Sequence, residues 1–599
     1  MTEIDAVERL VDAFAARGGQ PGLAYGVIEG GRLVHSGGRG WAALPGSAAA
    51  AAGRVPDADT VFRIASMTKS FTAAAVLLLR DEGALALDDD AVRWVPELAG
   101  VTPPTADAPP ITLRTLLTMA AGFPTDDPWG DRQQGLPDES FAALVAGGLS
   151  LAWTPGTAFE YSNLGYALLG RVVTAAAATP YAEFVTRRLL GPCGLPSTCF
   201  EAGDVPPEQL AVGHARAELG WRELPYDPLG AFAPMGGLFS SVRDVARWVG
   251  GFTDAYPPRD DPEGDHPLRR ASRRELQQPH RAYPPQVVWA SVDAPPVVRA
   301  SAYGFGLVVD AHPRHGTLVG HSGGYPGFGS HMRWHQNSGL GVVVLGNSTY
   351  AMAYSLAEQL LDAVLDVRAA DRPAQRVLRG PVPVPVEPWP ETEAAAAEVE
   401  QLLAGWDDDL DGRLFAENVD LDEALPTRRR RMAVIRELIG PLSQDPAAVV
   451  EHASPAHRLW WLRGPGGRLR VEIRLTPQRP PRVQTLTLTT VPTPSPTLRR
   501  AVMMLRSSLN SSSPQVPELL AMAPEVDRAA LTRLLRAGAA WAGQVREAEV
   551  LAGDGMAETS VRLAGTRRDL VVGVRLAVDR PPAPNGEPRV AAVTLRPLG

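Results

Sequence analysis

The chain contains a single lysine, Lys69, and it stands three residues after Ser66. Lysine and arginine together number 58, so the other 57 basic residues are arginines. A guanidinium stays protonated at any workable pH, whereas burial can make an ammonium release its proton. A lone lysine therefore indicates a need for a removable proton. The alternative is a helix lysine that only forms a salt bridge, and the surrounding sequence has to separate the two.

The residues around this pair predict a buried helix. An extended run over 62–65 leads into an apolar stretch over 66–81, which ends near Gly83. A helix that is apolar nearly all round lies in a protein core. Ser66 would occupy its first turn, where free backbone N–H groups and the helix dipole favour negative charge, and Lys69 would share its face. A serine beside a desolvated lysine has the character of an activated nucleophile.

Two further motifs follow in the same part of the chain. The run 161–163 (Tyr-Ser-Asn) comes shortly after a Pro-Gly turn, and a helix is predicted to begin near Asn163. The run 320–328 is rich in glycine, lies between two predicted strands and suits close approach of a backbone to a ligand. From the residues alone, Tyr161 can also be a core aromatic, Asn163 a helix cap and His321 a structural histidine.

Taken in order, Ser66-x-x-Lys69, Tyr161-x-Asn163 and His321-x-Gly323 resemble the three signatures of the serine β-lactamase and penicillin-recognising superfamily. The branch most resembled contains class C β-lactamases, DD-peptidases, D-aminopeptidases and β-lactamase-fold esterases. The resemblance covers about residues 1–370. It implies an α+β fold, in which a β-lactamase/transpeptidase-like domain combines an antiparallel sheet with a helical insert.

The resemblance also implies roles for these residues. Ser66 would attack a carbonyl to form an acyl-enzyme, while Lys69 and Tyr161 shuttle the proton and lower each other's pKa. The backbone N–H groups of Ser66 and Gly324 would form the oxyanion hole. The expected substrate-binding residues are Asn163, His321, Ser322 and Gly323.

The third motif departs from the family pattern, because His321 replaces the lysine of Lys-Thr-Gly. Histidine is mostly neutral near pH 7, which disfavours recognition of a substrate carboxylate. If His321 contacts substrate, kcat/KM should show an inflection around pH 6–7. The predicted substrate is a small ester, or an amide or peptide. Alternatives are a DD-peptidase or β-lactamase, an acyltransferase of this fold, and an inert penicillin-binding scaffold. The acidic loop 126–131 either meets a substrate ammonium or serves as a turn and cap.

Composition limits the other possibilities. Hydrophobic residues make up 45% and charged residues 21%, as in globular proteins, and the net charge of −9 argues against nucleic-acid partners. No signal-peptide pattern and no run of about 18 apolar residues is seen, so we expect a cytoplasmic chain without a membrane partner. The two cysteines, Cys193 and Cys199, make no disulfide framework. We expect no cofactor, and no metal at the pairs His312/His315 and His331/His335, which lack a matching carboxylate or cysteine cluster in the sequence.

The predicted elements of residues 1–370 place strands at both ends of a helical stretch. A hairpin is expected over 23–37. Four strands and a closing helix are expected at 304–309, 317–319, 330–334, 341–345 and 350–365.

A proline-rich spacer over 371–392 follows, and then a repeat of about a hundred residues. The copies, 393–492 and 497–599, each predict helices followed by three or four strands, as in small α+β modules of the cystatin or NTF2-like kind. The arginine run 428–431 is expected on a solvated helix face. Neither copy shows a catalytic group, and we expect a homo-oligomer, if one forms, to use these modules.

Overall fold

The computed structural model describes residues 3–217, 220–288, 297–312, 314–368, 387–446, 448, 450–518, 520–524, 526–577 and 589–597. Two compact units make up the chain: residues 1–285, 300–377 and 476–481 form the first, and 286–299, 378–475 and 482–599 the second. The predicted spacer 371–392 lies outside the described residues up to position 386, and helix α12 (Pro390–Ala404) begins within its last residues.

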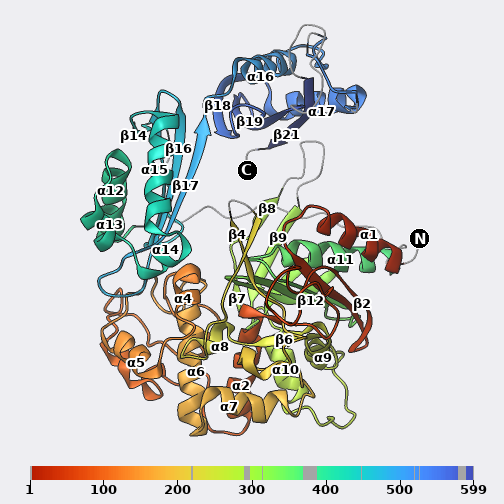
Figure 1. Ribbon diagram of the computed structural model, residues 1–599, viewed down its shortest axis with the longest axis vertical. Helices are drawn as coiled ribbons and strands as arrows, with labels where there is room; N and C mark the ends of the chain where they lie inside the picture. Colours follow the sequence, from red (N-terminus) through yellow and green to blue (C-terminus); the bar gives the residue numbers. More distant parts are fainter. Residues whose placement is uncertain are drawn as a thin grey trace. The chain divides into compact units, whose positions relative to one another are not determined.

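An antiparallel sheet forms the centre of the first unit (Figure 1), with strand order β2-β1-β13-β12-β11-β10-β9-β7. Strand β1 pairs with β13, so both ends of the unit meet in one sheet, as the sequence predicted. The strands are β1 (Gly22–Glu29), β2 (Arg32–Gly40), β7 (Arg281–Ala282), β9 (Val297–Tyr303), β10 (Val308–His312), β11 (Gly316–Tyr325), β12 (Phe328–His335) and β13 (Gly341–Gly346).

Helices cover both faces of this sheet. Helix α1 (Glu3–Ala15) and helix α11 (Ala353–Arg368) pack together on one face, where their apolar side chains join Leu23, Tyr25 and Val27 of β1 in one core. Helix α9 (Val242–Thr253) packs on the other face, together with the helical insert. Side chains alternate between the faces along each strand, so sequence position decides which helices a residue meets.

Helix α2 (Thr68–Asp81) is buried along Thr68–Leu79, which confirms the expected core helix. Its indole neighbour Trp248 stacks on Phe71, with ring centroids 4.0 Å apart. The expected position of Ser66 needs correction, because Ser66 lies in a separate 3₁₀ turn (Ala65–Met67) that precedes the α-helix. Ala65 has φ +46°, a left-handed conformation that costs a non-glycine residue about 1–3 kcal/mol. The nucleophile candidate is thus carried on a strained turn.

Two strand predictions also need correction. The residues 304–307 form the turn between β9 and β10 instead of a strand, because Gly306 has φ +66° and approaches helix α2 closely. A Cβ at Gly306 would lie 2.4 Å from the backbone oxygen of Lys69. Strand β11 is longer than predicted and contains the third motif, in register with β12.

The second unit contains two four-stranded antiparallel sheets, with orders β14-β15-β16-β17 and β18-β19-β20-β21, and each sheet has its own apolar core with helices. Helices precede the strands in both parts of this unit; that the two parts are repeated modules, and that they resemble cystatin or NTF2-like modules, stays a prediction. The remaining elements are α13 (Asp408–Leu414), α14 (Glu417–Asp422), α15 (Leu425–Ile439), β14 (Ser443–Gln444), β15 (His457–Gly464), β16 (Gly467–Leu475), β17 (Val483–Pro492), α16 (Pro496–Leu509), α17 (Arg528–Ala542), β18 (Val545–Ala552), β19 (Glu558–Gly565), β20 (Leu570–Ala577) and β21 (Arg589–Pro597).

The arginine run in α15 is not uniformly solvated. Arg428 is fully buried and donates hydrogen bonds from Nε and Nη2 to the carboxylate of Asp411 and from Nη2 to Asp420. The expectation for this residue was wrong, because its carboxylate partners lie on α13 and α14 and are not evident from the arginine run itself.

Candidate active site

Lys69 joins the first two motifs in one hydrogen-bonded group. Its Nζ lies 2.9 Å from Ser66 Oγ, 2.6 Å from Asn163 Oδ1 and 2.9 Å from the backbone oxygen of Met235. The lysine is fully buried and Ser66 is 8% exposed. The structure therefore brings Ser66, Lys69 and Asn163 together, and adds the backbone oxygen of Met235 from the short helix α8 (Ala233–Gly236), which lies outside the three motifs.

The partners of Lys69 determine where its lone pair points once a proton leaves. The Asn163 Oδ1 and Met235 oxygens can only accept hydrogen bonds, so a neutral amine keeps an N–H directed at each of them. The hydroxyl of Ser66 can also donate. The lone pair of neutral Lys69 therefore faces Ser66, which is the arrangement that a general base for this serine needs.

Burial lowers the pKa of Lys69 to about 8, while the carboxylates of Asp127, Asp131 and Asp126 act in the opposite direction. The loss of hydration dominates because the three direct partners are neutral groups. A sizeable fraction of Lys69 is then neutral in mildly alkaline solution, which no arginine could match.

Tyr161 lies at the same site. Its side chain is hydrogen-bonded to Ser66, and Lys69 Nζ lies 4.9 Å from the centre of its ring. Burial raises the pKa of Tyr161 well above the ordinary value, with the nearby Asp127 charge acting in the same direction. The expectation that Lys69 and Tyr161 lower each other's pKa is therefore wrong for the tyrosine. Tyr161 can pass a proton as a neutral hydroxyl but is not a phenolate.

Asn163 is the first residue of helix α6 (Asn163–Ala177), and Ser162 is the N-cap. Its Nδ2 donates to Asp127 Oδ1 at 2.8 Å while its Oδ1 accepts from Lys69, and the whole residue is buried. Both ends of the amide are thus engaged by the protein. The structure places Asn163 as a support for Lys69 and gives no contact that would reserve it for substrate.

The acidic loop serves as a cap at its first residue. Asp126 accepts the backbone N–H groups of Asn163 and Leu164 at 2.7 and 2.9 Å, where a carboxylate complements the helix N-terminus. Burial nevertheless raises the pKa of Asp126 to about 7. The two alternatives for the loop were contact with a substrate ammonium and a role as turn and cap. The contacts of Asp126 are those of a helix cap.

His321 is buried on the face of the sheet that meets the helical insert. Its Nδ1 lies 2.6 Å from the backbone oxygen of Ser322 and its Nε2 lies 2.9 Å from the hydroxyl of Tyr303. A carbonyl only accepts, so Nδ1 carries the proton and Nε2 accepts from Tyr303. Burial, helped by the charge of Lys69, lowers the pKa of His321 to about 3. The expected inflection around pH 6–7 is therefore wrong, because His321 stays neutral there.

The other residues of the third motif have packing roles. Ser322 Oγ lies 2.8 Å from His331 Nδ1, and the His331 ring meets Tyr354 of α11, so this serine points to the opposite face of the sheet. Its expected role in substrate binding is corrected for that reason. A Cβ at Gly323 would lie 2.2 Å from the Ile64 oxygen, so Gly323 allows β11 to approach the turn that carries Ser66. Gly324 follows on the same strand.

Three contributors escaped the sequence reasoning: Met235, Asp127 and Tyr303. Met235 contributes only a backbone oxygen, and a pattern of side chains cannot predict a backbone contact. Tyr303 lies 18 positions before His321, at the end of strand β9, whereas His321 is in β11. No local motif connects the two residues. Asp127 stood in the acidic loop, and a carboxylate next to a motif amide was the signal that could have drawn attention to it.

The described residues contain one group that could hold a metal ion, His312, His315 and Asp362. The sequence expectation that this histidine pair lacks a carboxylate is therefore wrong. Cys193 and Cys199 are both free thiols. Among the described helices, none combines the length and the apolar character that a membrane span requires.

Three known proteins show what the chain is similar to. The D-alanyl-D-alanine-carboxypeptidase/endopeptidase AmpH of Escherichia coli K12 is 27% identical over 379 residues, covering 61% of this chain and 89% of AmpH. Protein flp of Staphylococcus aureus N315 is 25% identical over 362 residues, covering 59% and 65%. The octameric penicillin-binding protein homologue from Pyrococcus abyssi shares the fold with a TM-score of 0.53 at 16% identity, covering 96% of both chains.

The family comparison agrees with the site. The family described as Beta-lactamase matches residues 7–365, which span the sheet, the helical insert and all three motifs. Since this match covers more than half of the chain and includes the group around Lys69, the chain belongs to the Beta-lactamase family of hydrolases.

Proposed function

We propose that the protein is a serine hydrolase that forms an acyl-enzyme at Ser66. The observation that carries this proposal is the Lys69 amine, which lies 2.9 Å from Ser66 Oγ with two acceptor-only groups as its other partners. A buried amine with a lowered pKa, held against a serine hydroxyl, is a means of activating that hydroxyl.

In the proposed reaction neutral Lys69 takes the proton of Ser66 as Oγ adds to the substrate carbonyl. The backbone N–H groups of Ser66 and Gly324 stabilise the negative oxygen of the tetrahedral intermediate. The proton then returns to the leaving alcohol or amine, with the neutral hydroxyl of Tyr161 as relay, and the acyl-enzyme remains. Water repeats the sequence and releases the acid.

The proposed substrate is a small ester, or an amide or peptide of the kind that D-aminopeptidases cleave. Support comes from His321, which stands where the related enzymes have a lysine and is neutral and hydrogen-bonded on both nitrogens. Such a group offers no fixed positive charge to a substrate carboxylate. The name of AmpH includes a carboxypeptidase activity, which makes DD-peptidase or β-lactamase action the second candidate.

A fluorophosphonate probe tests the nucleophile, with Ser66→Ala as the matched control. Stoichiometric labelling of the wild type but not of Ser66→Ala is expected. A folded wild type that resists labelling and leaves p-nitrophenyl esters intact would favour the inert scaffold instead. Turnover of esters and D-amino-acid amides above that of D-alanyl-D-alanine peptides and a chromogenic cephalosporin is the expected substrate order. Faster reaction when an added alcohol or amine accepts the acyl group would identify an acyltransferase.

We also propose a cytoplasmic protein whose second unit mediates any self-association. The Pyrococcus abyssi homologue, described as octameric, shares the fold over nearly the whole chain. Light scattering of the full chain, compared with a chain ending near Ala370, tests the second part. If the full chain and the shortened chain contain the same number of subunits, the second unit is not required for self-association.

A further inference from the structure

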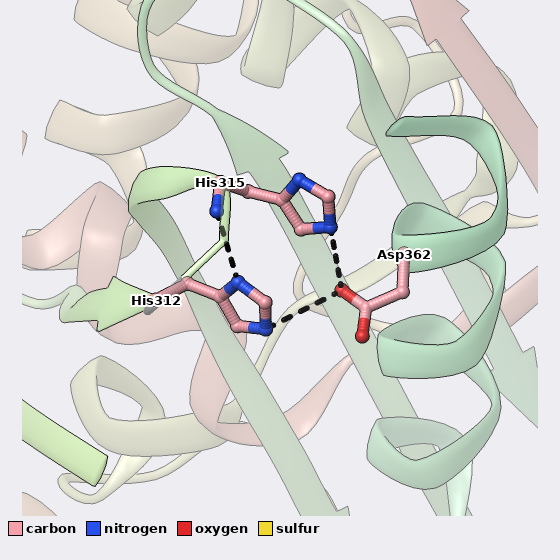
Figure 2. A group of neighbouring side chains, drawn as sticks. All are labelled: His312, His315 and Asp362. Atoms are coloured by element: carbon pink, nitrogen blue, oxygen red, sulfur yellow. Dashed lines mark hydrogen bonds and ion pairs between the residues drawn. The ribbon is translucent and has the colours of Figure 1, made fainter. Parts of the chain in front are cut away.

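A group of three metal-ligand side chains lies away from the candidate active site. His312 ends strand β10, His315 stands in the turn before β11, and Asp362 belongs to helix α11 (Figure 2). This group is on the face of the sheet that α11 covers, whereas His321 and Lys69 are on the face of the helical insert. Asp362 follows His312 by 50 positions and His315 by 47, so only the fold brings the carboxylate to the histidines.

The three donor atoms converge on one point. His312 Nε2 lies 3.8 Å and His315 Nε2 4.0 Å from the same oxygen, Asp362 Oδ1, and all three atoms lie within 4.8 Å of one another (Figure 2). The imidazole rings are nearly parallel, with centroids 4.7 Å apart. Tetrahedral Zn²⁺ with bonds of about 2.0–2.1 Å places its donor atoms about 3.3 Å apart. The three side chains would therefore need to shift by about 1 Å or less to bind the ion.

Two of these atoms lack a hydrogen-bond partner among the described residues. His315 Nε2 and Asp362 Oδ1 are buried and make no hydrogen bond, although His315 Nε2 lies 3.2 Å from Asp366 Oδ1 in an ion pair, and the His315 side chain is 4% exposed. An unsatisfied buried polar atom costs about 1–3 kcal/mol. A cation between His315 Nε2 and Asp362 Oδ1 would satisfy both atoms at once, whereas a proton on His315 Nε2 is within reach of Asp366 only.

The surrounding charges leave the group suited to a cation. Asp366 also lies near, with Oδ1 3.2 Å from His315 Nε2, and Arg314 pairs with it at 2.6 Å. Arg314 lies 3.4 Å from the other oxygen of Asp362, and Arg333 is paired with Asp310 at 2.9 Å. Two carboxylates therefore face one arginine at the turn, and the local charge stays negative.

His312 must change its tautomer for a metal to bind. Its Nδ1 accepts long hydrogen bonds of 3.3 and 3.2 Å from the backbone N–H groups of Arg314 and His315. The proton of the neutral ring is therefore on Nε2, towards Asp362. Metal uptake moves it to Nδ1 and requires the turn to open these two contacts, which lowers the affinity relative to a fully prearranged site.

We propose that His312, His315 and Asp362 bind one divalent transition-metal ion, with Zn²⁺ the best fit, and that water completes the coordination. Two imidazoles and a carboxylate are ligands that Zn²⁺ prefers, with an open fourth position. The ion would fasten the β10–β11 turn to helix α11. This role is structural and separate from acylation at Ser66.

The test uses the tag-free full chain, stripped with a chelator and then given Zn²⁺ or Co²⁺ alone. Elemental analysis after desalting, competition with a chromogenic zinc chelator, and visible absorption of bound Co²⁺ measure the binding. Expected are one ion per chain and a higher Tm with Zn²⁺ than without it at about pH 7.5.

Three variants locate the ion. Asp362→Asn, which keeps the side-chain size, and His315→Gln should each weaken Zn²⁺ binding by at least about tenfold, since even changes behind the ligands cost about 10–100-fold. His280→Ala, a histidine outside the group, is the matched control and should bind like the wild type. Fluorophosphonate labelling of Ser66 in each variant verifies that it is folded. Absence of stoichiometric binding at 100 µM Zn²⁺, or equal binding by all three variants, would overturn the proposal.

Discussion

Two fully buried cations, one in each unit, differ in what surrounds them. Lys69 donates to a hydroxyl, an amide oxygen and a backbone oxygen, all neutral, and burial lowers its pKa to about 8. Arg428 donates to the carboxylates of Asp411 and Asp420, and these bonds outweigh burial and raise its pKa. Burial alone therefore does not mark a reactive site. A buried lysine with neutral partners can release a proton, whereas an arginine held by carboxylates stays charged and serves the fold.

The largest effect is expected for Arg428→Ala. This change leaves the buried carboxylate of Asp411 without its partner, which typically costs about 3–5 kcal/mol of stability. Denaturant unfolding, followed by the fluorescence of the second unit's tryptophans, measures the loss. Labelling of Ser66 per folded molecule should stay unchanged. A loss well below 1 kcal/mol would show that the pair is not the support that its geometry suggests.

Lys69→Arg makes the contrast sharper, because it keeps the charge and removes the releasable proton. We expect kcat to fall by at least ~10², as when a general base is lost. Burst-phase measurement of acylation with an activated ester separates this effect from a change in deacylation. Arg428→Lys is the control in the other unit. Near-normal acylation by Lys69→Arg would mean that Lys69 contributes only charge.

The pH dependence of kcat/KM tests the same proton. The pKa of Lys69 is about 8 and its neutral form is the proposed base, so kcat/KM should rise about tenfold per unit below pH 8 and level off above it. A plateau that extends down to pH 6 would contradict this assignment. Denaturation at the alkaline end is excluded by measuring the far-UV spectrum in parallel.

His321 should contribute no titration between pH 5 and 8, since its pKa is about 3 and both nitrogens have partners. His321→Gln, which is neutral and can still meet Tyr303, should change the shape of the pH profile little. His321→Lys introduces a charge beside Lys69 and should lower the apparent pKa of the activity. An inflection near pH 6.5 that disappears in His321→Gln would show that this histidine does titrate.

The smallest effect is expected from removing residues 371–599, which leaves residues 286–299 of the second unit in place. A chain that ends near Ala370 retains Ser66, Lys69, Tyr161 and both ends of the sheet. It loses residues 476–481, which belong to the first unit, so a modest loss of stability is expected. Active-site titration should still show acylation, with changes confined to KM or assembly. A folded fragment that cannot acylate would place part of the active site in the missing residues.

Local patterns predicted what local physics decides. The apolar run of α2, the first hairpin, strand β13 and the start of α6 near Asn163 follow from periodicity, glycine turns and capping. The motifs pointed to Ser66, Lys69 and Tyr161, which the structure places together. The orientation of Ser322 could also have been predicted, because side chains alternate along a strand and Ser322 therefore lies on the face opposite to His321.

Other features depend on contacts across long separations. Residues 304–307 of the strand expected over 304–309 form a turn because the backbone at Gly306 must pass close to Lys69, and no local pattern shows that neighbour. Arg428 looked solvated until α13 supplied Asp411, and the histidine pair gained Asp362 only through the packing of α11 on the sheet. The pKa of Tyr161 rises because its burial outweighs the help of a hydrogen bond.

A single, fully buried lysine also makes the chain its own reporter of unfolding. A protease that cuts only after lysine has one cleavage site in the entire protein, between Lys69 and Ser70. That bond lies in a helix with no exposed residue for two turns, so cleavage requires α2 to open. The rate at which one band becomes two on a gel then measures how often helix α2 leaves the core, and an inhibitor bound covalently at Ser66 should slow it.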